Sequence, residues 1–197
     1  MPEPIATPSQ PQSAFPPRIE ELLQRAQQGE PIATLADAWP SPLDLATIES
    51  VRQLAEAQMD TSPRAAHAVA GLAYTLARRL HQSVPRGHRT RALRGRCAAT
   101  LAAAERRCAN YPLAASLLSE GVGLLKGRRN APARRRAQLE RASLLRDLDR
   151  YEEAEAAYQT VLADAQQARD AQHDLASSHR GLGQVLRARN RYSEAVQ

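Results

Sequence analysis

Apolar residues recur at helical spacing along most of the chain, and prolines, glycines and short polar clusters separate the periodic segments. None of the four prolines after residue 42 lies inside a periodic segment, and three of them stand where the first turn of a helix tolerates a missing N–H. The pattern predicts helices at about 17–28, 43–58, 63–81, 89–109, 111–126, 131–149, 151–168, 171–189 and from 191 onward. We therefore expect an all-α chain of antiparallel helix pairs joined by short turns.

The composition supports helices and argues against several other classes of protein. Aromatic residues make up only 4% of the chain, with one Trp and one Phe, which is too few for the core of a β-sandwich or barrel. No stretch of 18 apolar residues is present, so we expect no membrane-spanning segment. The N-terminus has neither the basic nor the apolar region of a signal peptide, and the chain has two cysteines. These features predict a cytoplasmic protein.

Proline content divides the chain. Nine of the 13 prolines lie in residues 1–42. We expect residues 1–16 to be a disordered Pro-rich leader, 17–42 a short helix and linker, 43–88 a degenerate N-terminal helical repeat, and 89–197 a set of clearer repeats. The last repeat is incomplete at Gln197, so we expect that the natural polypeptide continues. The alternatives are that a partner covers the uncapped end or that this end self-associates.

A repeat is visible when the chain is compared with itself. Three segments each carry two small residues 12 positions apart, with a tyrosine three residues before the second: Ala102, Tyr111 and Ala114; Ala142, Tyr151 and Ala154; Gly183, Tyr192 and Ala195. Successive segments are offset by 40 and then 41 residues. Paired small residues let two helices approach closely, and a hairpin built this way must stack on its neighbour to bury its remaining apolar face.

Two of these segments resemble the core of a tetratricopeptide repeat. The first runs from Leu182-Gly183 to Tyr192 and Ala195, and the second from Leu144-Leu145 to Tyr151 and Ala154, with Tyr158 at the aromatic position of the family's second helix. The resemblance implies a right-handed α-solenoid whose first helices line a concave ligand surface, acting as a non-catalytic protein-interaction scaffold. The units are longer than the family's usual length of about 34 residues, as in bacterial regulatory and signalling proteins, and a period near 40 also fits HEAT-type repeats.

Basic charge is concentrated in the middle of the chain. Residues 61–150 carry 19 bases against five acids, whereas residues 1–60 and 151–197 are both net acidic. Arginines also follow the repeat. One register position holds Arg106, Arg146 and Arg187, and a second holds Arg96 and Arg136. Arg180 lies near this second position in the third unit. Guanidinium groups grip carboxylates or phosphates bidentately. We therefore predict a partner-binding groove for an acidic peptide or domain; the alternative is that these arginines only face water.

Nucleic acid is the competing ligand. Residues 86–107 and 126–136 are dense in arginine, but they contain no aromatic residues for base stacking and no groove-reading motif. We therefore expect only non-specific contact with phosphates. A further alternative is that the chain is the N-terminal regulatory or sensory segment of a larger signal-transduction protein, such as a diguanylate cyclase, a caspase-like protease or a transcriptional regulator.

The residue types that support catalysis do not form a recognisable site in the sequence. Cys97 and Cys108 fall on one predicted helix about 16 Å apart, too far to form a disulfide. The five histidines lack metal-ligand spacing, and the glycine pairs lack the lysine of a phosphate loop. We therefore expect no enzyme activity, no metal site and no cofactor.

Overall fold

The computed structural model describes residues 15–168 and 171–190, and within them every regular element is a helix. The elements are α1 (Pro17–Gln27), α2 (Ile32–Ala38), α3 (Leu45–Gln58), α4 (Pro63–Ser83), α5 (His88–Arg107), α6 (Tyr111–Leu124), the short 3-10 helix η1 (Arg128–Asn130), α7 (Ala131–Asp147), α8 (Tyr151–Gln166) and α9 (Gln172–Ala188). The all-α prediction is confirmed, and the predicted helices match α1 and α3 to α9 to within two residues at each end. None of the described helices is both long enough and apolar enough to cross a membrane.

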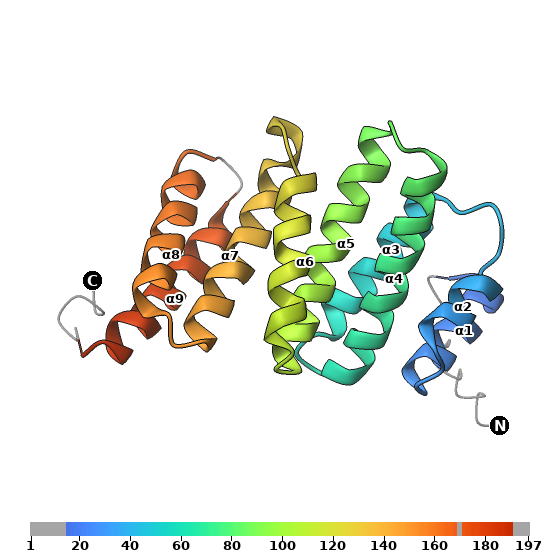
Figure 1. The fold of residues 1–197 in the computed structure, drawn as a ribbon, viewed down its shortest axis with the longest axis horizontal. Coiled ribbons are helices and arrows are strands. Elements are labelled where there is room, and N and C mark those ends of the chain that lie inside the picture. Colours follow the sequence, from blue (N-terminus) through green and yellow to red (C-terminus); the bar gives the residue numbers. More distant parts are fainter. Residues whose placement is uncertain (1–14, 169–170, 191–197) are drawn as a thin grey trace, which may run out of the picture.

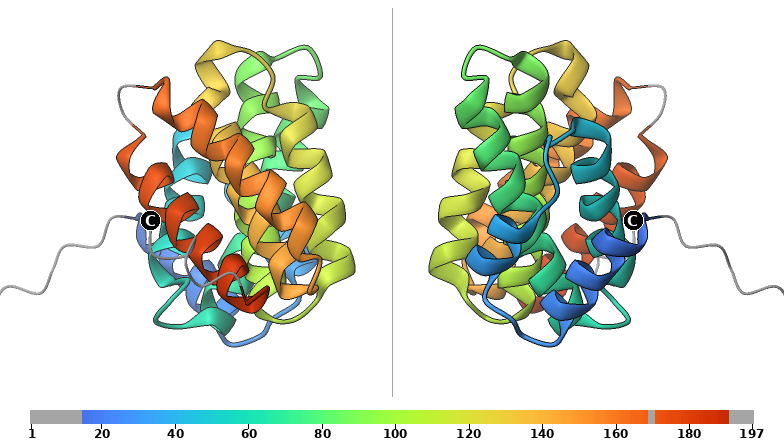
Figure 2. Two further views of the ribbon diagram at one scale, coloured as in Figure 1. Left: turned by 90° about the vertical axis from the view of Figure 1, so that its left-hand side faces the viewer. Right: turned by 90° about the vertical axis from the view of Figure 1, so that its right-hand side faces the viewer.

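The helices stack in the order of the sequence. From α3 onward each helix packs on the next (Figure 1). In addition, α3 packs on α5, α5 on α7, and α7 on α9. The hairpins α3–α4, α5–α6 and α7–α8 therefore form two layers, with α3, α5, α7 and α9 inside and α4, α6 and α8 outside. Figure 2 shows the stack from its two ends, with α8 and α9 at one end and α1 and α2 at the other. This is the architecture of a helical repeat solenoid.

The same turn ends three of the four inner helices. Ala109, Asp149 and Asn190 follow α5, α7 and α9, and each has a positive φ close to 60°. After Ala109, the N–H of Asn110 donates to the carbonyl of Glu105 at 2.9 Å, and the corresponding bond after Asp149 has the same length. This is the Schellman arrangement, which satisfies the last carbonyls of a helix and reverses the chain at once. It explains why α5–α6 and α7–α8 are joined by such short turns.

Small residues allow the helices of a hairpin to pack closely. Ala102, Ala114, Ala142 and Ala154 are fully buried, whereas Gly183, Tyr111 and Tyr151 are half-buried. A close approach also occurs at Gly181, where an added Cβ would lie 2.3 Å from the ring of the buried Tyr158. Gly95 and Gly121 make a similar crossing between α5 and α6. Tyr192 and Ala195 lie outside the described residues.

The apolar core has two parts. The larger extends through α1 to α6 and includes Leu144 of α7, while the smaller joins α7, α8 and α9 around Tyr158 and Val185. The segment 17–42, expected to hold one short helix and a linker, contains the second helix α2, which buries Leu35 and is followed by the buried Trp39. At seven residues, α2 is too short for its apolar period to be visible in the sequence. Both α1 and α2 pack on α4.

Candidate binding groove on the inner helices

A groove of 390 Å³ opens on the inner layer and takes side chains from α3, α5, α7 and α9. Along α5 and α7 the lining positions recur every three or four residues, which places them on one face of each helix. The residues that line it are Arg52, Glu56, Met59, Asp60, Arg96, Ala99, Thr100, Ala103, Arg107, Ala133, Arg136, Leu139, Glu140 and His173. The groove therefore combines an apolar floor with charges of both signs, and it spans three hairpins.

At the α3 end of the groove the charges neutralise each other. Arg52 is buried, and its guanidinium donates to Glu49 at 2.7 Å, to Glu56 and, at 3.3 Å, to the hydroxyl of Thr100 on α5. Burial alone would lower the pKa of Arg52, but the two carboxylates raise it above its ordinary value. The sequence analysis missed Arg52 because a single arginine on a helix gives no sign that it is buried.

Arg96 joins the same cluster from α5. Its guanidinium pairs with Glu49 at 3.1 Å and remains partly exposed in the groove. Burial would raise the pKa of Glu49, but the hydrogen bond and charge of Arg52 and the charge of Arg96 hold it below its usual range. Glu49 is therefore a carboxylate shared by two arginines, and it fixes Arg96 at the wall of the groove.

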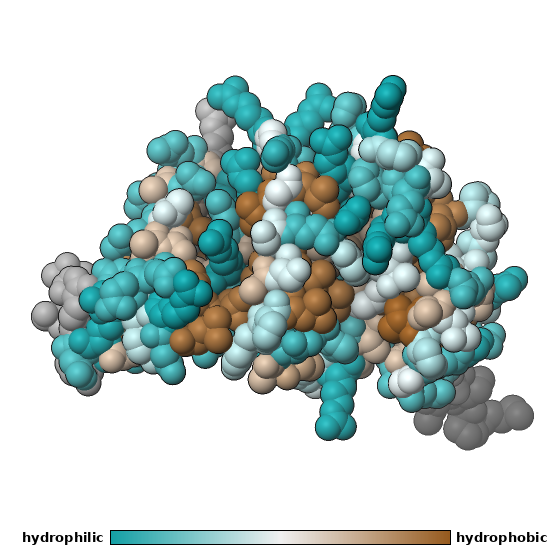
Figure 3. Space-filling model, in the orientation of Figure 1, coloured by the Kyte–Doolittle hydropathy of each residue, from teal (hydrophilic) through white to brown (hydrophobic). Residues whose placement is uncertain are grey.

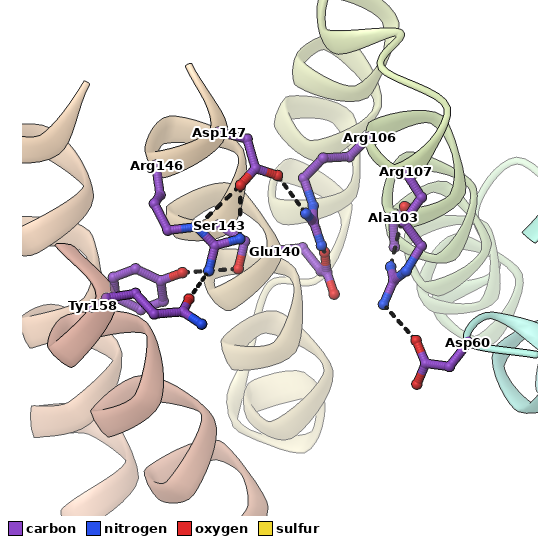
Figure 4. A network of polar contacts seen from close by, with 10 residues as sticks. Asp60, Ala103, Arg106, Arg107, Glu140, Ser143, Arg146, Asp147 and Tyr158 are labelled. Carbon is purple, nitrogen blue, oxygen red and sulfur yellow. Dashed lines mark hydrogen bonds and ion pairs between the residues drawn. The ribbon is translucent and has the colours of Figure 1, made fainter. Parts of the chain in front are cut away.

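Two of the three arginines at the shared register position form ion pairs with carboxylates of α7 (Figure 4). The Arg106 side chain is only 12% exposed, and it pairs with Glu140 at 3.1 Å and with Asp147 at 2.6 Å, both on α7. Burial would lower the pKa of Arg106, but these two carboxylates raise it. Arg146 pairs with the same Asp147 at 2.7 Å and donates to Gln184 of α9. Arg106 and Arg146 thus link successive inner helices.

The remaining predicted arginines face solvent. Arg187 is exposed and donates only to the carbonyl of Gly183 in its own helix, at 3.2 Å. Arg136 and Arg180 are exposed, and neither forms a hydrogen bond or ion pair within the described part of the chain. Arg136 lines the groove, and Arg180 stands at the register position of Leu139, which also lines it. Among the arginines predicted to line the groove, those without a carboxylate partner in the described part of the chain therefore lie on α7 and α9.

A buried ion pair joins α7 to α9. The Nε of Arg135 donates to Asp174 at 3.0 Å, and both side chains are almost fully buried. Three buried polar atoms beside it have no hydrogen-bond partner among the described residues: Nη2 of Arg135, Oε1 of Gln138 and Oγ of Ser178. Sequence reasoning missed this pair because Arg135 is one of three consecutive arginines, and only the fold decides which of them points inward.

The cysteines are in contrasting surroundings. Cys97 is buried, and burial raises the pKa of its thiol to about 12, so it remains protonated at neutral pH. Cys108 is exposed at the turn after α5. Among the residues that the structure describes, no group of three His, Cys, Asp or Glu side chains is placed to hold a metal ion.

Comparison with known proteins gives one match. Residues 134–197 match the family model described as tetratricopeptide repeat, and this range begins in α7 and includes α8 and α9. Searches of curated proteins and of solved structures each found no match. Over residues 134–197, the chain is therefore similar to the tetratricopeptide repeat family.

Proposed function

We propose that this protein is a non-catalytic scaffold that binds an acidic segment of a protein partner in the groove on its inner helices. Similarity to the tetratricopeptide repeat family over residues 134–197 supports the role of interaction scaffold. We also propose that the repeat unit is 40 or 41 residues long throughout 89–197. The positive-φ turns at Ala109, Asp149 and Asn190 support this length, because they recur at that spacing.

The unpaired arginines carry the proposal of an acidic partner. Arg136, Arg180 and Arg187 have no carboxylate partner within the described part of the chain, whereas Arg52, Arg96 and Arg106 are already neutralised. A guanidinium group that is free and held on a helix can grip a carboxylate with two parallel hydrogen bonds. An acidic side chain of the partner would therefore lie against α7 and α9.

The apolar lining accounts for the rest of the binding. Met59, Ala99, Ala103 and Leu139 lie between the charged residues of the groove. Burial of apolar surface contributes roughly 25 cal/mol per Å², so apolar side chains of the partner supply affinity while the arginines set its orientation. We therefore expect a partner segment that combines acidic and aliphatic residues.

A synthetic peptide with alternating pairs of glutamate and leucine, labelled with fluorescein, tests this proposal by fluorescence anisotropy. The same peptide with lysine in place of glutamate serves as the reference. The acidic peptide should bind saturably and the lysine peptide should not. Arg136→Gln should weaken binding about fivefold, which corresponds to about 1 kcal/mol for one charge-assisted contact, and Arg180→Gln should act in the same direction.

The control variant is Arg141→Gln. Arg141 is also exposed on α7, but its charge acts on Glu153 of α8, away from the groove. This variant should bind the acidic peptide like the original protein. Equal binding of the two peptides, or equal weakening by Arg141→Gln and Arg136→Gln, would contradict the proposed groove.

A further inference from the structure

The connections α4–α5 and α6–α7 lie at the same edge of the solenoid, because α4 and α6 end there and α5 and α7 begin there (Figures 1 and 2). This edge is crowded with basic side chains. Its exposed members, which we call the basic edge, are Arg86, Arg89, Arg91, Lys126, Arg128 and Arg129. Figure 3 shows long hydrophilic side chains projecting along this edge. The groove lies on the inner layer instead, so the basic edge is a separate surface.

The charge of the basic edge has no counterpart nearby. Residues 76–104 and 121–139 contain neither Asp nor Glu. No side chain of the basic edge forms a hydrogen bond or ion pair within the described part of the chain. By contrast, Arg79 and Arg94, which lie closer to the helix bodies, pair with Asp37 at 2.6 Å and with Glu120 at 2.7 Å. Arg79 and Arg94 are therefore neutralised by carboxylates, whereas the side chains of the basic edge are not.

His81 lies within reach of two arginine charges, one of which, Arg91, belongs to the basic edge. It lies in the last turn of α4, and its pKa is lowered first by partial burial and then by the charges of Arg94 and Arg91. A positive field of this kind attracts polyanions and speeds their association.

The edge offers charge without apolar anchors. The one large apolar side chain on the α4–α5 connection that is strongly exposed is Val84, at 48%. Stable protein interfaces centre on buried aromatic or aliphatic anchors, and peripheral membrane binding needs apolar insertion as well as charge. A phosphate backbone requires only cations along its length, and the guanidinium fork matches its oxygens. These features favour a nucleic acid over an acidic protein or a membrane.

The dimensions and composition favour a duplex. Helices α4, α5, α6 and α7 pack one after another. At 8–10 Å per step, and with the helices alternating between the two layers, the edge extends for at most about 30 Å. That length is close to one turn of duplex DNA, about 34 Å. The basic edge has no aromatic side chain on which single-stranded bases could stack. We propose that the basic edge binds double-stranded nucleic acid through its phosphates, without reading the base sequence.

Fluorescence anisotropy with a labelled DNA duplex of about 20 base pairs, two helical turns, tests the proposal. Two charge-reversal variants are compared. Arg89→Glu with Arg129→Glu changes one residue of each connection in the basic edge, while Arg64→Glu with Arg150→Glu makes the same change in net charge at the opposite edge, where α4 and α8 begin. The first variant should weaken duplex binding at least tenfold, and the second should weaken it less than threefold.

Salt dependence and competitors complete the test. With about five phosphate contacts, affinity should fall roughly 500-fold between about 50 and 200 mM salt. Two duplexes of unrelated sequence should bind equally. Equal weakening by the two variants would overturn the proposal. It would also be overturned if polyglutamate or phosphatidylserine vesicles bound as tightly as the duplex and lost as much affinity in the Arg89→Glu, Arg129→Glu variant. Circular dichroism of both variants checks that each retains its helices.

Discussion

Arg106, Arg146 and Arg187 occupy the same place in successive units, but the structure predicts that they contribute very differently to stability. Arg106 is mostly buried between two carboxylates, and Arg146 shares one of these carboxylates. Among the described residues, Arg187 donates a hydrogen bond only to the carbonyl of Gly183 in its own helix. Replacing each in turn by glutamine removes the charge and keeps most of the aliphatic stem. The three variants should therefore lose stability in the order Arg106, Arg146, Arg187.

The magnitudes follow from burial. An exposed ion pair contributes about 0–1 kcal/mol, whereas breaking a buried pair costs about 3–5 kcal/mol. The Arg106 side chain is 12% exposed, and those of Glu140 and Asp147 are 27% and 22% exposed, so the abandoned carboxylates still reach water. We therefore expect Arg106→Gln to cost about 2 kcal/mol. Arg146→Gln should cost about 0.5 kcal/mol, because Asp147 keeps its bond to Arg106, and Arg187→Gln should cost roughly nothing.

Urea unfolding followed by far-ultraviolet circular dichroism measures these differences. With an unfolding slope of about 2 kcal/mol per molar urea, Arg106→Gln should lower the midpoint by about 1 M, and Arg187→Gln should leave it unchanged. Equal losses for the three variants, or the largest loss for Arg187→Gln, would refute the reasoning, since the register position would then matter more than the ion pairs.

Three other predictions concern packing and chemistry. Gly181→Ala should destabilise the protein by about 2–3 kcal/mol in urea unfolding, because its Cβ would overlap the ring of Tyr158; an unchanged midpoint would mean that the ring has room to move. Ala109→Gly should stabilise by about 1 kcal/mol in the same assay, since alanine is strained at positive φ. Iodoacetamide at neutral pH should label Cys108 rapidly and Cys97 only after unfolding, as mass spectrometry of the peptides will show.

The sequence predicted the helices well because their signals are local. The apolar period lies within each helix itself. The prolines at helix starts and the tyrosines at Tyr111 and Tyr151 lie in the first turn of the helices that they mark. The helix α2 was missed because its burial against α4 stabilises it, and seven residues carry too little pattern of their own. The close contact at Gly181 was not predicted, since the space that Tyr158 occupies depends on how α7, α8 and α9 pack together.

The binding residues were harder to predict than the fold. The register analysis placed Arg106, Arg146 and Arg187 at one position, but it could not show that Glu140 and Asp147 would lie across from Arg106, because those carboxylates come from the next unit. The groove as a site for an acidic partner remains a proposal. Arg136 lines the groove, and Arg180 stands on α9 at the register position of Leu139; the described chain leaves the charge of both unpaired.

Nuclear magnetic resonance mapping of the acidic peptide on the isotopically labelled protein tests the central claim most directly. We predict saturable shift changes in the backbone amides of the inner helices around Ala99, Arg136, Leu139 and Arg180, with the outer helices α4, α6 and α8 unaffected. Saturable changes centred on the outer helices, or no changes up to millimolar peptide, would contradict a partner-binding groove on the inner helices.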